Sequence, residues 1–494
     1  MVANRENFPL LAELLADQQR LDTPVARFSN AHDAQAIAIA PQLIPLSKPG
    51  PGEQYAFEVD LDSCTGCKSC VAACHSLNGL DETETWRDIG QLVSPSRAHP
   101  FTQTVTTACH HCADPACLNG CPVLAYDKDP ITGIVRHLDD QCIGCSYCIL
   151  KCPYDVPKFS TRLGIVRKCD MCHSRLAAGE APACAQACPT HAIKIVTVPV
   201  AASTSFLPAA PDVAYTQPTT RYVSKRTLPA NLVAADAGTP PLQPAHWPLV
   251  VMLTLIPAAV GLQCAHVLLS SGSQLSTLRP QLLPGAAAAL GALGLAASVF
   301  HLGQPLRAWR IFLGWRKSWL SREAMLFGAW FPLAAGAILF PQLALPAAAL
   351  GVVGLVCSAM IYVDTRRHFW RAAQTFPRFF GTAAVLALPF ISPYAAALAL
   401  LVKLAWETRT TAEPGAPKRH QRGPLVSAVA VRDVLCLLSI ALLVAAPQLS
   451  PWIVFVPIFL GELAERYIFF RAVDAPKMPG LPTVASSAPK ACAA

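Results

Sequence analysis

DDQCIGCSYCILKCPYDVPK, residues 139–158, contains four cysteines at the spacing C-x-x-C-x-x-C-x-x-x-C, and a proline follows the last one. Three thiolates at steps of three can wrap one face of a cubane iron–sulfur cluster, while the remote cysteine before proline reaches a neighbouring cluster. Zinc sites also use C-x-x-C pairs, but a third cysteine and a Cys-Pro ending are not the tetrahedral zinc pattern. This stretch therefore predicts a ferredoxin-like fold built around iron–sulfur clusters.

Three similar quartets surround this one, so that sixteen of the 20 cysteines lie between Cys64 and Cys188. In a ferredoxin-like repeat, the first three cysteines of one motif share a cluster with the last cysteine of its symmetry partner. The spacings predict two nested units and four [4Fe-4S] clusters. The predicted ligand sets are Cys64, Cys67, Cys70 and Cys188; Cys169, Cys172, Cys184 and Cys74; Cys109, Cys112, Cys117 and Cys152; and Cys142, Cys145, Cys148 and Cys121.

The cysteine-rich part is expected to move electrons in the cytoplasm. Residues 1–55 contain neither a basic segment followed by an apolar run nor a twin arginine, so no secretory signal is recognisable. In a reducing compartment, clustered cysteines favour cluster ligation over disulfides. No acid/base pair, nucleophile triad or phosphate loop accompanies the quartets, so we expect no turnover of substrate by this chain alone.

Long apolar runs begin after Trp247, and only 14% of the residues are charged, against about 25% in an ordinary soluble protein. The net charge of +8 arises mostly from short basic loops between these runs. Such loops act as membrane topology signals, so we expect a lipid bilayer and no nucleic acid as partner. Spanning segments are expected at residues 247–269, 282–300, 324–340, 343–363, 434–447 with flanking residues, and 452–470.

Residues 379–405 are long for one crossing and short for two, and loop charge decides between these options. Basic loops at 307–322, 366–378 and 403–422 alternate with nearly neutral turns near residues 272, 341 and 449. Two crossings with a turn near Ser392 keep all the basic loops on the cytoplasmic side. The sequence thus predicts eight helices in the inner membrane, with the iron–sulfur domain and both termini cytoplasmic.

The predicted fold is an α+β double ferredoxin-like four-cluster module followed by an all-α transmembrane bundle of about eight helices. Short strands are expected at residues 55–59, 133–137 and 192–198, and an amphipathic helix at residues 8–21. The predicted division is an N-terminal helix and extended docking segment (1–54), the cluster domain (55–198), an Ala/Pro/Thr-rich linker (199–245), the transmembrane anchor (246–471) and a flexible tail (472–494).

His301 and Glu323 are ionisable residues at the ends of two adjacent predicted spans. Ionisable groups at membrane depth often face a cavity, and a histidine with a carboxylate can take protons from a quinol. Both side chains could equally extend to the interface and contact water. A haem would need axial histidines on facing helices, and few histidines lie in or beside the spans, so no haem is expected.

The motifs TACHHCADPACLNGCP (107–122) and DDQCIGCSYCILKCPYDVPK resemble the four-cluster electron-transfer subunit of dimethyl sulfoxide reductase-type molybdoenzymes. The run VFHLGQPLRAWRIFLGWRKSWLSREAM (299–325) resembles the membrane-anchor subunit of the same family. The resemblance implies fused iron–sulfur and anchor subunits, a separate molybdopterin-containing catalytic subunit, and a quinone or quinol site at His301 and Glu323. The alternative is a membrane-tethered polyferredoxin that docks soluble redox partners without a quinone site.

Overall fold

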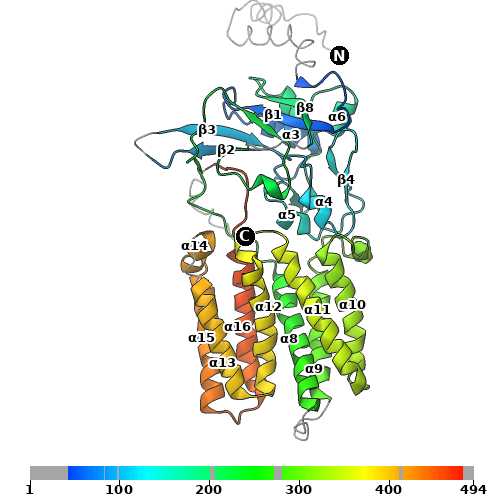
Figure 1. The fold of residues 1–494 in the computed structure, drawn as a ribbon, viewed down its shortest axis with the longest axis vertical. Helices are drawn as coiled ribbons and strands as arrows, with labels where there is room; N and C mark the ends of the chain where they lie inside the picture. Colours follow the sequence, from blue (N-terminus) through cyan, green and yellow to red (C-terminus); the bar gives the residue numbers. More distant parts are fainter. Residues whose placement is uncertain are drawn as a thin grey trace, which may run out of the picture.

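The computed structural model describes residues 43–82, 84–96, 100–200, 206–271, 281–410 and 415–481. Strands and short helices form a module at one end of the molecule, and long helices stand side by side as a bundle at the other end (Figure 1). The cysteine quartets lie in the module, and the long apolar helices form the bundle. The predicted helix at residues 8–21 lies outside the described residues.

Two strands from opposite ends of the cysteine-rich segment pair with each other. Strand β1 (Glu53–Asp60) precedes the first quartet and pairs antiparallel with β8 (Ile193–Pro199), which follows the fourth, with Phe57 opposite Ile195. This pairing brings the two ends of the cysteine-rich segment together. The predicted strands at 55–59 and 192–198 lie at these positions, and that at 133–137 overlaps β5.

Smaller sheets and short helices complete the module. The other strands are β2 (Asp88–Val93), β3 (Thr102–Thr107), β4 (Tyr126–Lys128), β5 (Val135–His137), β6 (Lys158–Ser160), β7 (Ile165–Arg167), β9 (Arg221–Val223) and β10 (Val233–Ala234). The helices are α3 (Ser69–Asn78), α4 (Ala116–Gly120), α5 (Tyr147–Lys151), α6 (His173–Ala177) and α7 (Ala183–Gln186). Cysteines form part of the buried core, beside apolar side chains such as Phe57 and Val105.

Eight long helices make up the described part of the bundle. They are α8 (Trp247–Ser271), α9 (Leu282–Val299), α10 (Trp319–Gly336), α11 (Ala344–Val363), α12 (Ala372–Ala387), α13 (Pro393–Thr410), α15 (Val426–Ala445) and α16 (Pro451–Arg471), with the short α14 (Ala416–Arg422) before α15. Among the described residues, four segments have the length and apolar composition of membrane spans: Trp247–Ser270, Leu282–Val299, Pro341–Val363 and Val426–Ala445. The chain is a membrane protein, and eight crossings remain a prediction.

The ambiguous stretch at 379–405 is divided between two helices. Helix α12 ends at Ala387, a short 3-10 turn follows at Leu388–Phe390, and α13 begins at Pro393. The break lies beside Ser392, and the two helices lie next to each other in the bundle (Figure 1). A stretch that crosses the membrane twice needs two adjacent helices joined by a turn, as α12 and α13 are.

The linker and the start of the tail are more ordered than the sequence predicts. In the linker, β9 adds in parallel to β1 and β10 pairs with β2. In the tail, the backbone N–H of Gln91 donates to the carbonyl of Gly480 at 3.2 Å, and Met478 is buried in the module core. Strands of two or three residues are too short to show a hydrophobic period, so composition alone suggests a loose connector. Residues 482–494 lie outside the described part of the chain.

Candidate functional site

The thiols that the spacing groups together are neighbours in the structure. Cys188 lies beside Cys64 and Cys70, and Cys74 lies within electrostatic reach of Cys172 and Cys184. The other two predicted sets gather in the same way, with Cys152 beside Cys109, Cys112 and Cys117, and Cys121 beside Cys142, Cys145 and Cys148. None of the described cysteines forms a disulfide.

The surroundings of the thiols suit iron–sulfur clusters. Backbone N–H groups donate to sulfur at Cys121, Cys142 and Cys169, from Ala125, Gly144 and Met171 at 3.2, 3.4 and 3.4 Å. Hydrogen bonds of this kind tune cluster potentials. Among the described residues, no three Cys, His, Asp or Glu side chains gather tightly enough for a single metal ion, as zinc requires.

Two buried cations accompany the thiols. Lys168 donates from Nζ to Cys109 Sγ at 3.6 Å and to the carbonyl of Cys169 at 2.8 Å, and so lies between two quartets. Arg87 is 2% exposed, and the neighbouring thiols raise its pKa although burial opposes this. Burial raises the pKa of Cys74 to about 12. Ionised sulfur ligands therefore need positive charge nearby, which these cations supply and which the iron of a bound cluster would add.

The loop of the third quartet docks on the loop that follows α9. His301 donates from Nε2 to the carbonyl of Cys145 at 3.1 Å, and Gln304 donates from its backbone N–H to Ile143 at 3.0 Å. The backbones of Gly144 and Gly303 approach so closely that a Cβ atom on Gly144 would lie 2.8 Å from the nitrogen of Gly303. The third quartet is thereby fixed against the bundle.

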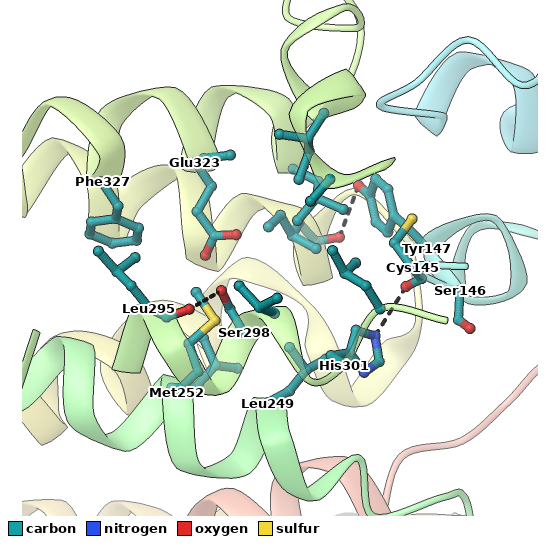
Figure 2. A pocket seen from close by; sticks show the side chains of 18 of the residues that line it. Cys145, Ser146, Tyr147, Leu249, Met252, Leu295, Ser298, His301, Glu323 and Phe327 are labelled. Carbon is teal, nitrogen blue, oxygen red and sulfur yellow. Dashed lines mark hydrogen bonds between the residues drawn. The ribbon is translucent and has the colours of Figure 1, made fainter. Parts of the chain in front are cut away.

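A cavity of about 340 Å³ lies where this loop meets α8, α9 and α10. Figure 2 shows Glu323 and Phe327 on α10 facing Leu295 and Ser298 on α9, with His301 and Cys145 at one end of the space. Most of the lining is apolar, and the short 3-10 helix η3 (Pro305–Phe312) contributes to the wall. Apolar walls with a few polar groups are typical of a site for a small organic ligand.

The cavity brings both sequence-predicted residues, His301 and Glu323, to one site. Glu323 is buried, and within the described part of the chain its Oε1 has no hydrogen-bond partner. Because the carbonyl of Cys145 can only accept, Nε2 of His301 carries hydrogen and a neutral ring leaves Nδ1 as an acceptor. Burial lowers the pKa of His301, which favours the neutral form of this ring.

The sequence did not indicate two further residues of the cavity, His246 and Tyr147. The ring of His246 lies 5.5 Å from that of His301, and burial together with His301 lowers the pKa of His246 to about 4. Tyr147 donates its hydroxyl to the carbonyl of Ile361 at 3.2 Å. The position of His246 directly before the first apolar run was the only available signal.

Arg307 and Arg322, two basic residues of the segment between α9 and α10, lie outside this cavity. Arg307 donates from Nη1 to the carbonyls of Asp139 and Cys142 at 3.2 and 3.3 Å, so it belongs to the docking contact. Arg322 donates to the carbonyls of Trp315 and Arg316 and stays at the surface.

The acidic and basic residues of the last helix pair across helices. Glu462 accepts from Nζ of Lys403 at 2.6 and 2.8 Å, and Glu465 accepts from Nη1 of Arg378 at 2.5 Å. Arg466 donates to the hydroxyl of Thr382 at 3.1 Å. These contacts pair the last helix with α12 and α13.

Comparisons with known proteins find matches for both the cysteine-rich module and the helical bundle. Residues 101–198 match the 4Fe-4S dicluster domain, and residues 244–389 match the DMSO reductase anchor subunit (DmsC). A relative from Haemophilus influenzae, one of the polypeptides of its anaerobic dimethyl sulfoxide reductase, is 36% identical over 155 residues, which cover 30% of this chain and 75% of that protein. Formate dehydrogenase-O iron-sulfur subunit of Escherichia coli is 35% identical over 162 residues, 29% of this chain and 54% of that protein.

The two matches lie in succession on one polypeptide, so iron–sulfur clusters and a membrane anchor belong to the same chain. The chain is thus a member of the dimethyl sulfoxide reductase-type iron–sulfur subunit family, with the anchor subunit of that family fused to it.

Proposed function

We propose that the chain relays electrons between a separate molybdopterin-containing catalytic subunit and the quinone pool of the inner membrane. The sixteen cysteines of the four sets would ligate four [4Fe-4S] clusters, which accept and release single electrons when bound. The observation that carries the proposal is the cavity shared by the third-quartet loop and the anchor helices. The unpartnered Oε1 of Glu323 belongs to a mostly apolar cavity that Cys145, a proposed cluster ligand, also lines.

The cavity suits a quinol or quinone ring. Such a ring is flat and apolar and carries an oxygen at each of two opposite positions, so it needs apolar walls and two polar partners. Nδ1 of His301 and the carboxylate of Glu323 can each accept a hydrogen bond from a quinol hydroxyl. Oxidation of one quinol yields one quinone, two electrons and two protons, and these two groups can take the protons as they leave.

The docking contact gives the electrons a short route out of the cavity. His301 bonds the backbone of Cys145, and the loop that carries Cys145 also carries Cys142 and Cys148. The cluster of Cys142, Cys145, Cys148 and Cys121 would therefore exchange electrons with the quinone first. The three other clusters would lead through the module to the catalytic subunit, with this domain and both termini on the cytoplasmic side.

Substitution of His301 or Glu323 by alanine tests the proposal in membranes that contain the whole complex. We expect quinol-linked turnover to fall by about 10²-fold or more because proton transfer loses its partner, while the iron content stays normal. The matched control is His368→Ala, since His368 is exposed and lies outside the cavity. Normal quinol-linked turnover in both cavity variants would favour the tethered polyferredoxin that needs no quinone site.

A further inference from the structure

A second cavity, of about 490 Å³, lies where the iron–sulfur module, the linker and the tail meet the bundle. It adjoins the first cavity at His246 and His301. Cavities of this size are typical of sites for organic molecules, since a single inorganic ion fills only a small part of such a volume. The proposed quinone site assigns no ligand to this second space.

One arginine in the wall of the second cavity lacks a counter-charge. Arg367, in the loop between α11 and α12, is 4% exposed, and in the described part of the chain its Nε and Nη1 have no hydrogen-bond partner. Its guanidinium carbon lies 5.1 Å from the centre of the Trp370 ring, and burial lowers the pKa of Arg367 to about 10. A buried cation without an anion is strongly unfavourable, so a negatively charged ligand would stabilise this site.

The two other charged residues of the wall already have partners. Asp155 pairs with Lys158 at 2.6 Å, and Lys477 pairs with Asp236. Arg367 is thus the one cation of the wall that no described carboxylate neutralises.

The exposed edge of the cavity lies beside the start of the first apolar span. Pro241 and Pro244 of the linker line the cavity and are exposed. Arg471, the last residue of α16, fixes this stretch to the bundle by donating from Nη1 to the carbonyl of Gln243 at 2.9 Å. Trp247, the first residue of α8, is 56% exposed, and tryptophan at the end of a span is typical of the zone of lipid headgroups. The cavity is therefore accessible at the level of the headgroups.

The rest of the wall suits a lipid that carries negative charge. Ile149, Leu150 and Phe159 add apolar surface to the cavity that contains Arg367. The loop segment 366–371 contains three arginines and no acidic residue, so it favours an anionic lipid over a zwitterionic one, whose own cation it would repel. Basic pockets at the ends of membrane helices bind anionic headgroups.

We propose that this cavity binds the phosphate headgroup of an anionic phospholipid, with Arg367 as its main partner, and that the bound lipid joins the iron–sulfur module to the anchor. A guanidinium can donate two parallel hydrogen bonds to one phosphate group. The site does not depend on the proposed quinone site, because its lining and its charge need no quinone.

The test measures the Tm of purified, delipidated full-length holoprotein in a neutral detergent, with added phosphatidylglycerol, phosphatidylcholine or inorganic phosphate. A ligand that binds only the folded state raises Tm as its concentration increases. Phosphatidylglycerol should raise the Tm of wild type in a saturable way, whereas the two other additives should have little effect. Phosphorus analysis checks the removal of lipid, and iron analysis checks that the clusters are intact.

Two variants assign the effect to one side chain. In Arg367→Met, half of the Tm shift should require at least about tenfold more phosphatidylglycerol, because the charged hydrogen bonds are lost. The matched control is Arg366→Met, since Arg366 is exposed and lies outside the cavity; it should respond like wild type. Without lipid, Arg367→Met should melt at or above the wild-type temperature, because it removes a buried charge that has no partner.

Four results would overturn the site. Equal Tm shifts with phosphatidylglycerol and phosphatidylcholine would show that the negative headgroup is not recognised. A full shift with inorganic phosphate alone would assign the cavity to a soluble anion. A wild-type response of Arg367→Met would exclude Arg367 as the partner of the lipid. A Tm of Arg367→Met below that of wild type without lipid would give Arg367 a structural role instead.

Discussion

Replacement of Gly303 by alanine should force the iron–sulfur module away from the anchor. A Cβ atom at this position would lie 2.7 Å from the carbonyl carbon of Gly164 and closer still to its oxygen. Ordinary contact begins at 3.4 Å, so the two backbones must separate by at least 0.7 Å (3.4 − 2.7). Overpacking of this kind costs about 1–3 kcal/mol, which lowers Tm by about 2–12 °C in a domain of this size.

Thermal unfolding in detergent and quinone-linked reoxidation of the clusters both measure this change. Because Gly303 follows His301 by two residues, the separation should also slow electron exchange with the cavity. The control is Gly285→Ala, where space is open and alanine should stabilise the helix by about 0.5–1 kcal/mol. If Gly303→Ala has the wild-type Tm and the wild-type rate of quinone-linked reoxidation, the docking geometry is wrong.

Two further substitutions test other parts of the structure. Lys403→Met removes the cation that bonds Glu462 and Glu407 inside the bundle. We expect the free energy of unfolding to fall by about 3–5 kcal/mol and Tm to fall by about 6–20 °C. An unchanged Tm would contradict the pairing. Cys145→Ser should lower the iron content by up to about one cluster in four, as measured by iron analysis and EPR. It should also abolish quinone-linked reoxidation of the clusters. Full iron content would exclude Cys145 as a ligand.

Cysteine spacing predicts more of the module than hydrophobic pattern does. The thiols that spacing groups are neighbours because β1 and β8 bring the first and fourth quartets together. The strands themselves are short, and two of them, β9 and β10, lie in a segment whose composition suggests a loose linker. Ligand spacing is thus a stronger constraint in this module than residue propensity.

In the anchor, apolar length and loop charge predict the helices well, including the break beside Ser392. The sequence also singles out His301 and Glu323, which the fold brings to one cavity. It gives no sign that the third quartet docks there, because the docked loop takes part through backbone atoms: the carbonyls of Cys142 and Cys145 accept from side chains, and Gly144 approaches Gly303. Backbone contacts between distant glycines leave no pattern in a single sequence.

The most direct test of the quinone site uses purified protein with all clusters reduced and excess reductant removed. Anaerobic mixing with a long-tailed naphthoquinone should restore the absorbance of oxidised clusters in wild type, and should do so about 10²-fold more slowly in Glu323→Gln. Ferricyanide, which needs no cavity, should oxidise both proteins at the same rate. If the naphthoquinone leaves the wild-type clusters reduced, or oxidises both proteins equally fast, the cavity beside Cys145 is not the site of electron exchange with quinone.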